Sequence, residues 1–443
     1  MRIKLSDHFT YKKLLRFSLP SVIMMVFTSI YGVIDGLFVS NIVGKIQFAA
    51  INLVFPIIMI VGAFGFMMGA GGTAFVSKTL GEKRRDEANE YFSLIVYVTA
   101  IVGVIMSVIC FIFMRPFSEL LGAKGVTLDY CVTYGRLVIL AMPFFMMQNL
   151  FQSFFIAAEK PKLGLLVTVA AGVTNIVLDA LFVWVLGFGL EGAAIATSLS
   201  QAVGGIIPIF YFARKNSSLL RLTKTSFYGK VLVRSMTNGS SELMSNISAS
   251  IVTVLYNIQL MKFAKEDGVA AYGVIMYVGF IFTAMFIGFS ISCAPVVGFH
   301  YGANNTSELK SILKKSTLIL FVSGGVMLSV GEIFAEPLAR IFVGYSPELL
   351  LMTARGLRIF SLSFLISGFC IFSSSFFTAL NNGPVSAAIS FMRTLVYQLS
   401  LVLILPIFFR LDGIWFSMVV AELLALFTTL IFLFANRKKY QYM

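Results

Sequence analysis

The chain has 443 residues, of which 58% are hydrophobic and 12% are charged, and its mean hydropathy is +0.91. This composition excludes an ordinary soluble protein, because a soluble chain of this length needs more polar surface and normally divides into domains joined by charged linkers. The formal net charge is +14, but apolar runs of membrane-spanning length recur from end to end, so the basic residues are topology signals and we expect no nucleic-acid partner.

A helix of about 20 apolar residues spans a bilayer core and satisfies its own backbone hydrogen bonds there. We therefore predict an all-α polytopic membrane protein with twelve transmembrane helices. The predicted spans are residues 14–40, 48–77, 91–114, 127–157, 161–187, 192–213, 232–261, 269–299, 312–334, 353–380, 384–409 and 413–435.

The first predicted span carries a carboxylate in an otherwise uncharged run. Asp35 lies between Gly32 and Gly36, and small residues allow a neighbouring helix to approach closely. A charge at membrane depth costs at least about 2.5–3.5 kcal/mol on insertion scales, so Asp35 is a functional candidate by default. The alternative is a structural carboxylate that hydrogen-bonds neighbouring helices.

The fifth predicted span carries a second polar cluster. Asn175 and Asp179 are four residues apart, so both project from one helix face. A carboxylate and an amide oxygen on one face can begin a site for a hard cation such as Na⁺. They can equally form a protonatable carboxyl group with a hydrogen-bonding neighbour, and the pattern leaves both possibilities open.

A basic segment rich in Ser and Thr follows the sixth predicted span. We interpret residues 214–231 as a cytoplasmic linker between an N-terminal lobe, 1–213, and a C-terminal lobe, 232–443. Positive charge concentrates on the linker's side of the membrane, which predicts that both termini are cytoplasmic in a multi-pass cell-membrane protein. The residues that carry this asymmetry include Lys12, Lys13, Arg16, Lys83, Arg84, Arg85, Arg214, Lys215, Arg437, Lys438 and Lys439.

The second half repeats the first at a constant shift of 221 residues. Gly81 corresponds to Gly302, and further pairs are Phe113 with Phe334 and Pro116 with Pro337. Each half holds six predicted spans, an even number, so the halves are parallel repeats that suit alternating access. At this shift Asp35 corresponds to Tyr256 and Asp179 to Ser400, which confines this pair of acids to the N-terminal lobe.

Two further acids lie in spans of the second half. Glu242 stands early in the seventh span and Glu422 near the middle of the last. For Glu242 the alternative to a functional role is a solvated residue near the helix entrance, and for Glu422 it is a structural carboxylate.

The sequence shows no recognisable cluster of catalytic or metal-binding residues. The four cysteines lack metal-ligand spacing, and His8 and His300 stand near predicted membrane ends. There is no G-x-x-x-x-G-K-[ST] motif for a nucleotide. We therefore predict a protein that is not an enzyme, has no cofactor and is driven by an ion gradient.

The order of these motifs resembles that of multidrug and toxic compound extrusion (MATE) transporters over nearly the whole chain. The resemblance rests on the first span with Phe17-Ser18-Leu19-Pro20 and Asp35, on Asn175-x-x-x-Asp179, on the following segment 189–197, and on Gly81 with its echo Gly302. It implies a cation site in the N-terminal lobe, at Asp35, Asn175, Asp179 and Thr197 with Tyr134 nearby, and a helix that bends at Pro20.

The resemblance also marks a difference. Some family members carry an acid in the tenth span, whereas residues 359–382 contain none. Glu242 resembles an acid of those members and is a weaker candidate for binding substrate or ion.

These observations predict a monomeric secondary exporter that expels organic, often cationic, amphipathic compounds against H⁺ or Na⁺. The 21 methionines and 45 phenylalanines permit varied ligands, although most of them must serve packing or face lipid. The alternative is a flippase for a lipid-linked saccharide or precursor from the same superfamily, for which Arg136, Arg355, Arg358 and Arg393 would be the available basic groups.

Overall fold

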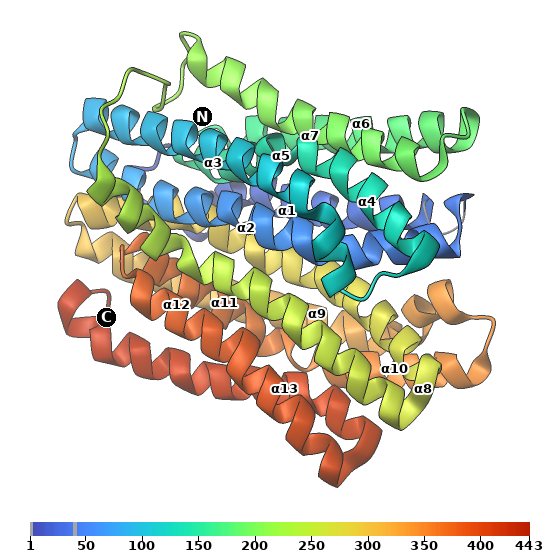
Figure 1. Ribbon diagram of the computed structural model, residues 1–443. Coiled ribbons are helices and arrows are strands. Elements are labelled where there is room, and N and C mark those ends of the chain that lie inside the picture. Colours follow the sequence, from blue (N-terminus) through green and yellow to red (C-terminus); the bar gives the residue numbers. More distant parts are fainter. Residues whose placement is uncertain (1–2, 39–41) are drawn as a thin grey trace.

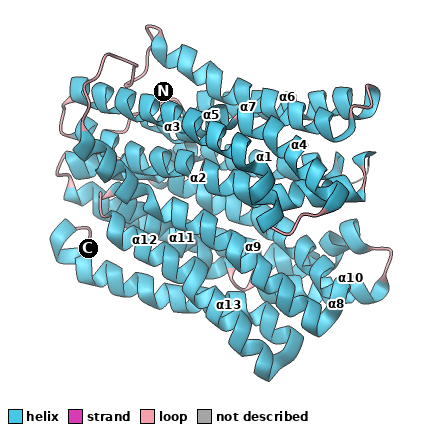
Figure 2. Ribbon diagram, in the orientation of Figure 1, coloured by secondary structure: helices cyan, strands magenta, loops and turns pink. Residues whose placement is uncertain are grey.

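The computed structural model describes residues 3–38 and 42–443, without the side chains of residues 35–38 and 45. The described residues form helices joined by short turns, with no strand among them (Figure 2). The helices of the first half are α1 (Tyr11–Phe38), α2 (Lys45–Gly81), α3 (Arg85–Leu120), α4 (Gly125–Leu140), α5 (Met142–Ala157), α6 (Pro161–Asp179), the π-helical segment η2 (Ala180–Val185) and α7 (Gly189–Ala213).

The second half begins with the longest helix. Its helices are α8 (Gly229–Gly302), α9 (Thr306–Val343), α10 (Pro347–Ser361), α11 (Phe364–Ala379), α12 (Gly383–Phe391), the π-helical segment η3 (Met392–Tyr397) and α13 (Gln398–Tyr440).

Together these helices cross the membrane twelve times, as predicted. Six crossings are single helices, with η2 continuing α6, and two are bent pairs, α4 with α5 at 53° and α10 with α11 at 50°. The first bend lies at Ala141, two residues before Pro143, whose missing N–H and bulky ring interrupt a helix. The remaining four crossings lie in α8 and in the run from α12 to α13, which each contain two.

Two residues with positive φ reverse the chain inside these long runs. Lys265 has φ 54° and ψ −145°, and Arg410 has φ 49° and ψ −127°, so neither is helical. Both ends of α8 pack against the second half of α2, at Gly71 and Gly81. The chain therefore turns back at Lys265, and the same end of the molecule receives both ends of α8.

The two halves of the chain form two helical lobes that lie one above the other in Figure 1. Residues 3–38 and 42–213, blue to green, form the upper lobe, and α8 to α13, yellow-green to red, form the lower one. Both described chain ends lie towards the left, at the end of the bundle that we call the termini end. The most extensive contacts between the lobes are those of α2 with α8, followed by α1 with α8.

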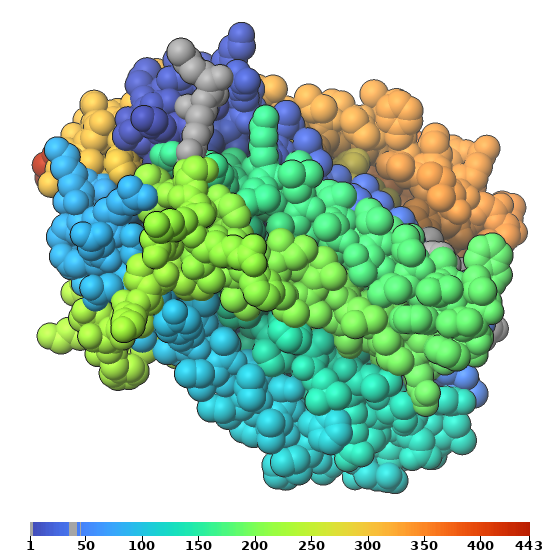
Figure 3. Space-filling model, turned by 90° about the horizontal axis from the view of Figure 1, so that it is seen from above, coloured from blue at the N-terminus to red at the C-terminus, as the bar shows by residue number. Residues whose placement is uncertain are grey.

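The linker between α7 and α8 lies against the N-terminal lobe. Its lime-coloured segment runs beside the start of α3 in Figure 3. Arg85 donates hydrogen bonds to the carbonyl oxygens of Ser218 and Leu219 at 3.0 and 3.1 Å, and the Thr223 amide donates to Ser93 Oγ at 2.8 Å.

Glycines related by the sequence repeat bring the lobes together at the termini end. A Cβ atom on Gly81 would lie 2.0 Å from the Phe299 carbonyl oxygen, and one on Gly302 would lie 2.0 Å from the Lys78 carbonyl oxygen. Lys78 and Phe299 are separated by the same 221 residues as the two glycines. The contact is therefore symmetric, and only residues without a Cβ permit so close a crossing.

The N-terminal segment, residues 3–10, also joins the two lobes at this end. The Leu5 amide donates to Glu159 Oε1 at 2.9 Å, and Glu159 belongs to the turn between α5 and α6. The Phe9 amide donates to Glu308 Oε1 at 2.9 Å, and Glu308 lies in the first turn of α9. Leu5 and Phe9 are fully buried, so this segment is part of the packed seam.

Candidate functional site

One face of α6 holds the polar residues predicted from the fifth span. Asn175 is 2% exposed and Asp179 is 1% exposed. Gly172 precedes them on the same face, where a Cβ would lie 2.5 Å from the ring of Phe27 and 3.0 Å from the ring of Tyr31. This face of α6 therefore packs directly against α1, and the amide and carboxylate are buried in the N-terminal lobe.

Asp179 stands where the helix changes its hydrogen-bonding register. The α-helical part ends at this residue, and η2 continues from Ala180 with a π-helical bond from the Leu186 amide to the Leu181 carbonyl oxygen at 2.9 Å. Single π-helical turns inside α-helices are found frequently at functional sites. The irregular backbone follows the buried acid at once.

The backbone of α1 places Asp35 at a comparable depth, but its side chain lies outside the described residues. α1 and α6 both run away from the termini end, and they meet where Phe27 and Tyr31 contact Gly172. Position 35 lies one turn beyond Tyr31, a rise of about 6 Å, and position 179 lies about 10 Å beyond Gly172. The two backbones therefore reach the same level of the lobe within about one turn.

The other predicted members of the site lie on neighbouring helices. Thr197 is half-buried on α7, which packs against α6, and its buried hydroxyl has no hydrogen-bond partner among the described residues. Tyr134 on α4 is 5% exposed and belongs to an apolar cluster with Val54 and Ala194. The structure thus places Asn175 and Asp179 on one face of α6 and Thr197 on the helix that packs beside it, and the ring of Tyr134 packs into the core of the lobe.

Pro20 is buried inside α1, which is helical from Tyr11 to Phe38 in this structure. Proline supplies no N–H, so the Arg16 carbonyl oxygen loses its ordinary helical donor. This makes position 20 a weak point of the helix, and bending there remains a prediction.

Glu242 lies apart from this cluster, between the lobes. It lines a narrow cavity of about 20 Å³ together with Thr73 and Ser153 of the N-terminal lobe and Ser375 and Thr378 of the C-terminal lobe. No lysine, arginine or histidine of the described residues forms a salt bridge with it. Because the lining of this cavity includes Thr73 and Ser153, Glu242 on α8 faces the N-terminal lobe.

Glu422 forms a buried ion pair that the sequence did not assign. Its carboxylate accepts from Arg393 Nε at 2.9 and 3.0 Å, and Arg393 Nη2 lies 2.7 Å from Oε1. The side chains are 14% exposed for Arg393 and 0% for Glu422. Opposite charges in the middle of two neighbouring spans could have suggested this pair, which gives the acid a structural partner.

The C-terminal lobe is neutral at the position that corresponds to Asp35. The Tyr256 hydroxyl lies 2.7 Å from Ser417 Oγ, and the Tyr256 ring stacks on Tyr272 with centroids 4.9 Å apart. The C-terminal lobe therefore has a hydrogen-bonded tyrosine hydroxyl at the position where the N-terminal lobe has the acid Asp35, as the sequence repeat predicted.

A metal site made from acids, histidines or thiols has no support in the described part of the chain. No group of three or more such side chains lies close enough together there to hold an ion.

Comparisons with known proteins agree on one family. The MatE family profile matches the chain twice, at residues 20–181 and 243–404. The multidrug export protein MepA of Staphylococcus haemolyticus is 24% identical over 430 residues, which cover 97% of this chain and 94% of that protein, and MepA of Staphylococcus saprophyticus is 23% identical over 441 residues, with the same shares covered.

The fold is shared with solved structures. A MATE protein in complex with MaL6 has a TM-score of 0.93 at 23% identity and 98% coverage of both chains. The outward-facing conformation of a multidrug resistance MATE family transporter also has a TM-score of 0.93, at 22% identity and the same coverage.

Proposed function

The chain belongs to the multidrug and toxic compound extrusion (MATE) family of transporters, and we propose that it exports amphipathic organic compounds, many of them cationic, in exchange for H⁺ or Na⁺. The coupling site is the N-terminal cluster of Asp35, Asn175, Asp179 and Thr197. The observation that carries this proposal is the burial of Asn175 and Asp179 on the α6 face against α1. An acid inside a membrane bundle is expensive, and ion pathways are the common reason for retaining one.

Orientation follows from charge. We place the termini end at the cytoplasm, because the basic segments lie there. The glycine crossing at Gly81 and Gly302 holds the lobes together at this end, which supports an outward-facing state for the structure. Opening to the cytoplasm then requires the lobes to separate at this crossing.

The exchange cycle uses the same cation site in two states. With the cavity open to the cytoplasm, Asp35 and Asp179 are ionised and the protein binds its organic substrate. From the outside the carboxylates take up a cation, α1 rearranges near Pro20, and the substrate is released. A ligand can only shift such an equilibrium through a difference in its affinity for the two states.

Glu242 has a separate role in this proposal. Its position between hydroxyl-bearing residues of both lobes supports contact with the substrate or ion when the lobes part. A carboxylate there would favour cationic substrates by direct charge attraction. We expect the exporter to act as a monomer, because each chain contains both lobes.

Everted membrane vesicles with a fluorescent cationic dye added to the medium test the coupling, because their cytoplasmic face is turned outward and export moves dye into the lumen. A pH gradient and a Na⁺ gradient are imposed separately. We expect Asp179→Asn and Asp35→Asn each to lower gradient-driven dye transport at least about tenfold, because neutral amides cannot exchange charge with the cation. Asp129→Asn is the matched control, since the Asp129 side chain is 72% exposed near the start of α4.

Dye binding to the purified variants separates a coupling defect from misfolding. Binding of the dye with loss of gradient-driven transport supports the coupling role. Transport at the wild-type rate in both Asp35→Asn and Asp179→Asn would refute the proposed site.

Three of the four basic groups that a flippase would have for a pyrophosphate contact other residues. Arg393 pairs with Glu422, and Arg355 Nη2 lies 2.6 Å from Asp412 Oδ2. Arg136 stacks over the ring of Phe111 at 5.1 Å from its centroid. These pairings favour export of organic cations, and stimulation by a lipid-linked saccharide without any dye transport would favour the flippase.

A further inference from the structure

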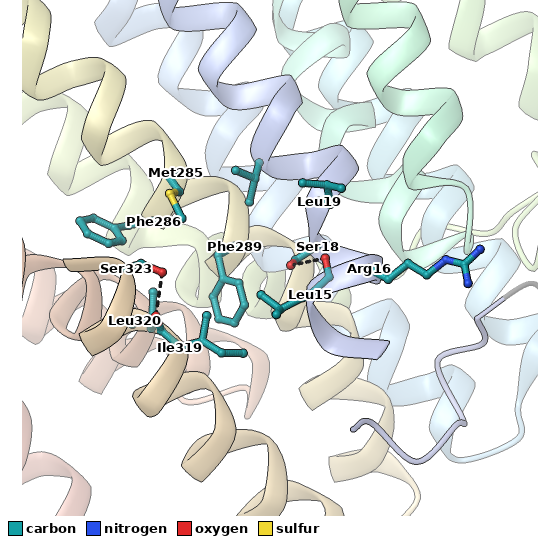
Figure 4. Close-up of a pocket in the computed structure, with 11 residues that line it drawn as sticks. Leu15, Arg16, Ser18, Leu19, Met285, Phe286, Phe289, Ile319, Leu320 and Ser323 are labelled. Atoms are coloured by element: carbon teal, nitrogen blue, oxygen red, sulfur yellow. Dashed lines mark hydrogen bonds between the residues drawn. The ribbon is translucent and has the colours of Figure 1, made fainter. Parts of the chain in front are cut away.

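The seam between the lobes carries a groove near the termini end. A cavity of about 260 Å³ lies between the first half of α1, the second half of α8, and α9 (Figure 4). Leu15 and Leu19 of α1 are 49% and 55% exposed on this membrane-spanning helix, so the groove opens sideways towards the bilayer. Its walls include Met285, Phe286, Phe289, Ile319 and Leu320.

The groove presents hydrocarbon surface. Its two serines are already satisfied, because Ser18 Oγ donates to the Leu15 carbonyl oxygen at 3.2 Å and Ser323 Oγ donates to the Ile319 carbonyl oxygen at 2.7 Å. Figure 4 shows both bonds folded back onto their own helices, and it shows Arg16 projecting away from the cavity. An occupant therefore needs an apolar chain, since the groove offers it few polar partners.

The mouth of the groove at the termini end is positively charged. Lys12 is exposed and lies one turn before Leu15 on the same face of α1. Lys315 lies one turn before Ile319 on α9, and its ammonium group donates to the Phe9 carbonyl oxygen at 2.6 Å. The two ammonium-bearing helices thus flank the place where the apolar groove meets the membrane surface.

The nearby acids, Asp7 and Glu308, contact residues other than Lys12 and Lys315. Asp7 lies 3.4 Å from the ammonium group of Lys13, and Glu308 lies 2.6 Å from the His8 ring. An apolar groove in the bilayer with a basic mouth at the membrane surface matches one chemical class of ligand. That ligand has an acyl chain joined to an anionic phosphate head group.

We propose that this groove binds one anionic phospholipid from the leaflet at the termini end, with an acyl chain between α1 and α9 and its phosphate at Lys12 and Lys315. The walls come from both lobes, so the site is complete only while the lobes are closed at this end. The bound lipid therefore stabilises the conformation closed at the termini end, by the difference between its affinities for the closed and open states.

Native mass spectrometry of the purified protein tests the head-group contact, using phosphatidylglycerol and phosphatidylcholine with identical acyl chains. We expect preferential retention of one phosphatidylglycerol. Lys12→Glu should weaken that binding about 30-fold, because it changes the charge at the membrane surface by two units. Lys438→Glu is the matched control, since Lys438 is exposed in the last turn of α13 at the same end.

A groove-filling variant tests the acyl contact. Leu19→Trp should lower the retention of both lipids at this site at least about tenfold, whereas Leu166→Trp, at a position 63% exposed on α6, should leave it unchanged. Unaltered retention in Leu19→Trp, or an equal loss in Lys12→Glu and Lys438→Glu, would show bulk annular lipid only and overturn the proposal.

The effect on conformation has its own readout. Spin labels at Lys83 and Asn304, exposed positions at the termini end of the two lobes, report whether this end is closed. Phosphatidylglycerol should raise the closed fraction of the wild type and not that of Leu19→Trp. An equal rise in both would refute stabilisation through the groove. These measurements need no transport activity, so their outcome is separate from that of the proposed ion coupling.

Discussion

At the scale of single residues, burial decides what each charge inside the bilayer can do. Arg393 and Glu422 form an ion pair through short contacts, and the Glu422 side chain is fully shielded from solvent. Asp179 is equally buried but stands on the α6 face with Asn175, at the start of a π-helical turn. The first arrangement is a fixed internal pair, and the second is the one that we propose exchanges a cation.

The Arg393–Glu422 pair can be tested by removing one partner. Arg393→Met should lower the free energy of unfolding by about 3–5 kcal/mol, because it leaves an uncompensated carboxylate in a buried site. Replacing both residues with methionine should restore most of that loss. Thermal unfolding of the detergent-solubilised variants measures both effects, and equal stability of the single and double variants would contradict the structural role of the pair.

At the scale of elements, the closure of the termini end depends on two kinds of contact. The first is the helix crossing at Gly81 and Gly302, and the second is the N-terminal segment that binds Glu159 of one lobe and Glu308 of the other. Both contacts must change before the lobes can separate there. We call these contacts together the gate, and the N-terminal segment, the eight residues 3–10, the strap. The free energy that keeps the termini end closed therefore comes from both the packed helix crossing and the hydrogen bonds of the strap.

Gly81→Val tests the crossing. A valine side chain would collide with the Phe299 carbonyl group, so the termini end should open and the distance between spin labels at Lys83 and Asn304 should increase. Gly325→Val on α9 is the matched control, because a Cβ at Gly325 meets nothing within 4 Å. Identical distance distributions in the two variants would show that the crossing does not hold the gate.

Glu308→Ala tests the strap. The change leaves the buried Phe9 amide without its acceptor, a loss of about 1–3 kcal/mol, so hydrogen exchange at Phe9 should become about tenfold faster or more. The His8 ring would also lose its partner at 2.6 Å. Glu266→Ala, at an exposed position beside the Lys265 turn, should leave this exchange rate unchanged, and protection at Phe9 that survives in Glu308→Ala would contradict the strap.

At the scale of the whole molecule, the two lobes are held together by much more than the linker. α2 and α1 both pack on α8, and the N-terminal segment reaches α9. The linker itself lies along α3 through Arg85 and Ser93. Its covalent continuity is therefore less important for assembly than the interface between the lobes.

Cleavage of the linker tests this view. A protease site inserted between Ser226 and Phe227, both exposed, would divide the chain into its two lobes after folding. We expect the halves to co-purify and to retain dye transport, because the α2–α8 and α1–α8 contacts remain. The same protein left uncut is the control, and separation of the halves in mild detergent would contradict the prediction.

The sequence by itself determined the twelve crossings, the two repeated halves and the residues Asp35, Asn175, Asp179 and Glu242 as unusual polar groups. These are local properties, because the cost of placing a segment or a charge in lipid depends on that segment's own composition. The α6 face could be predicted for the same reason, since a spacing of four residues fixes a common direction on a helix.

Only the tertiary structure decided which groups meet. The pairing of Arg393 with Glu422, the position of Glu242 between the lobes and the strap from Phe9 to Glu308 join segments that the sequence does not connect. Gly81 and Gly302 were visible as a repeat, but their mutual crossing was not. Partner choice depends on packing between distant helices, and that packing is a property of the folded chain as a whole.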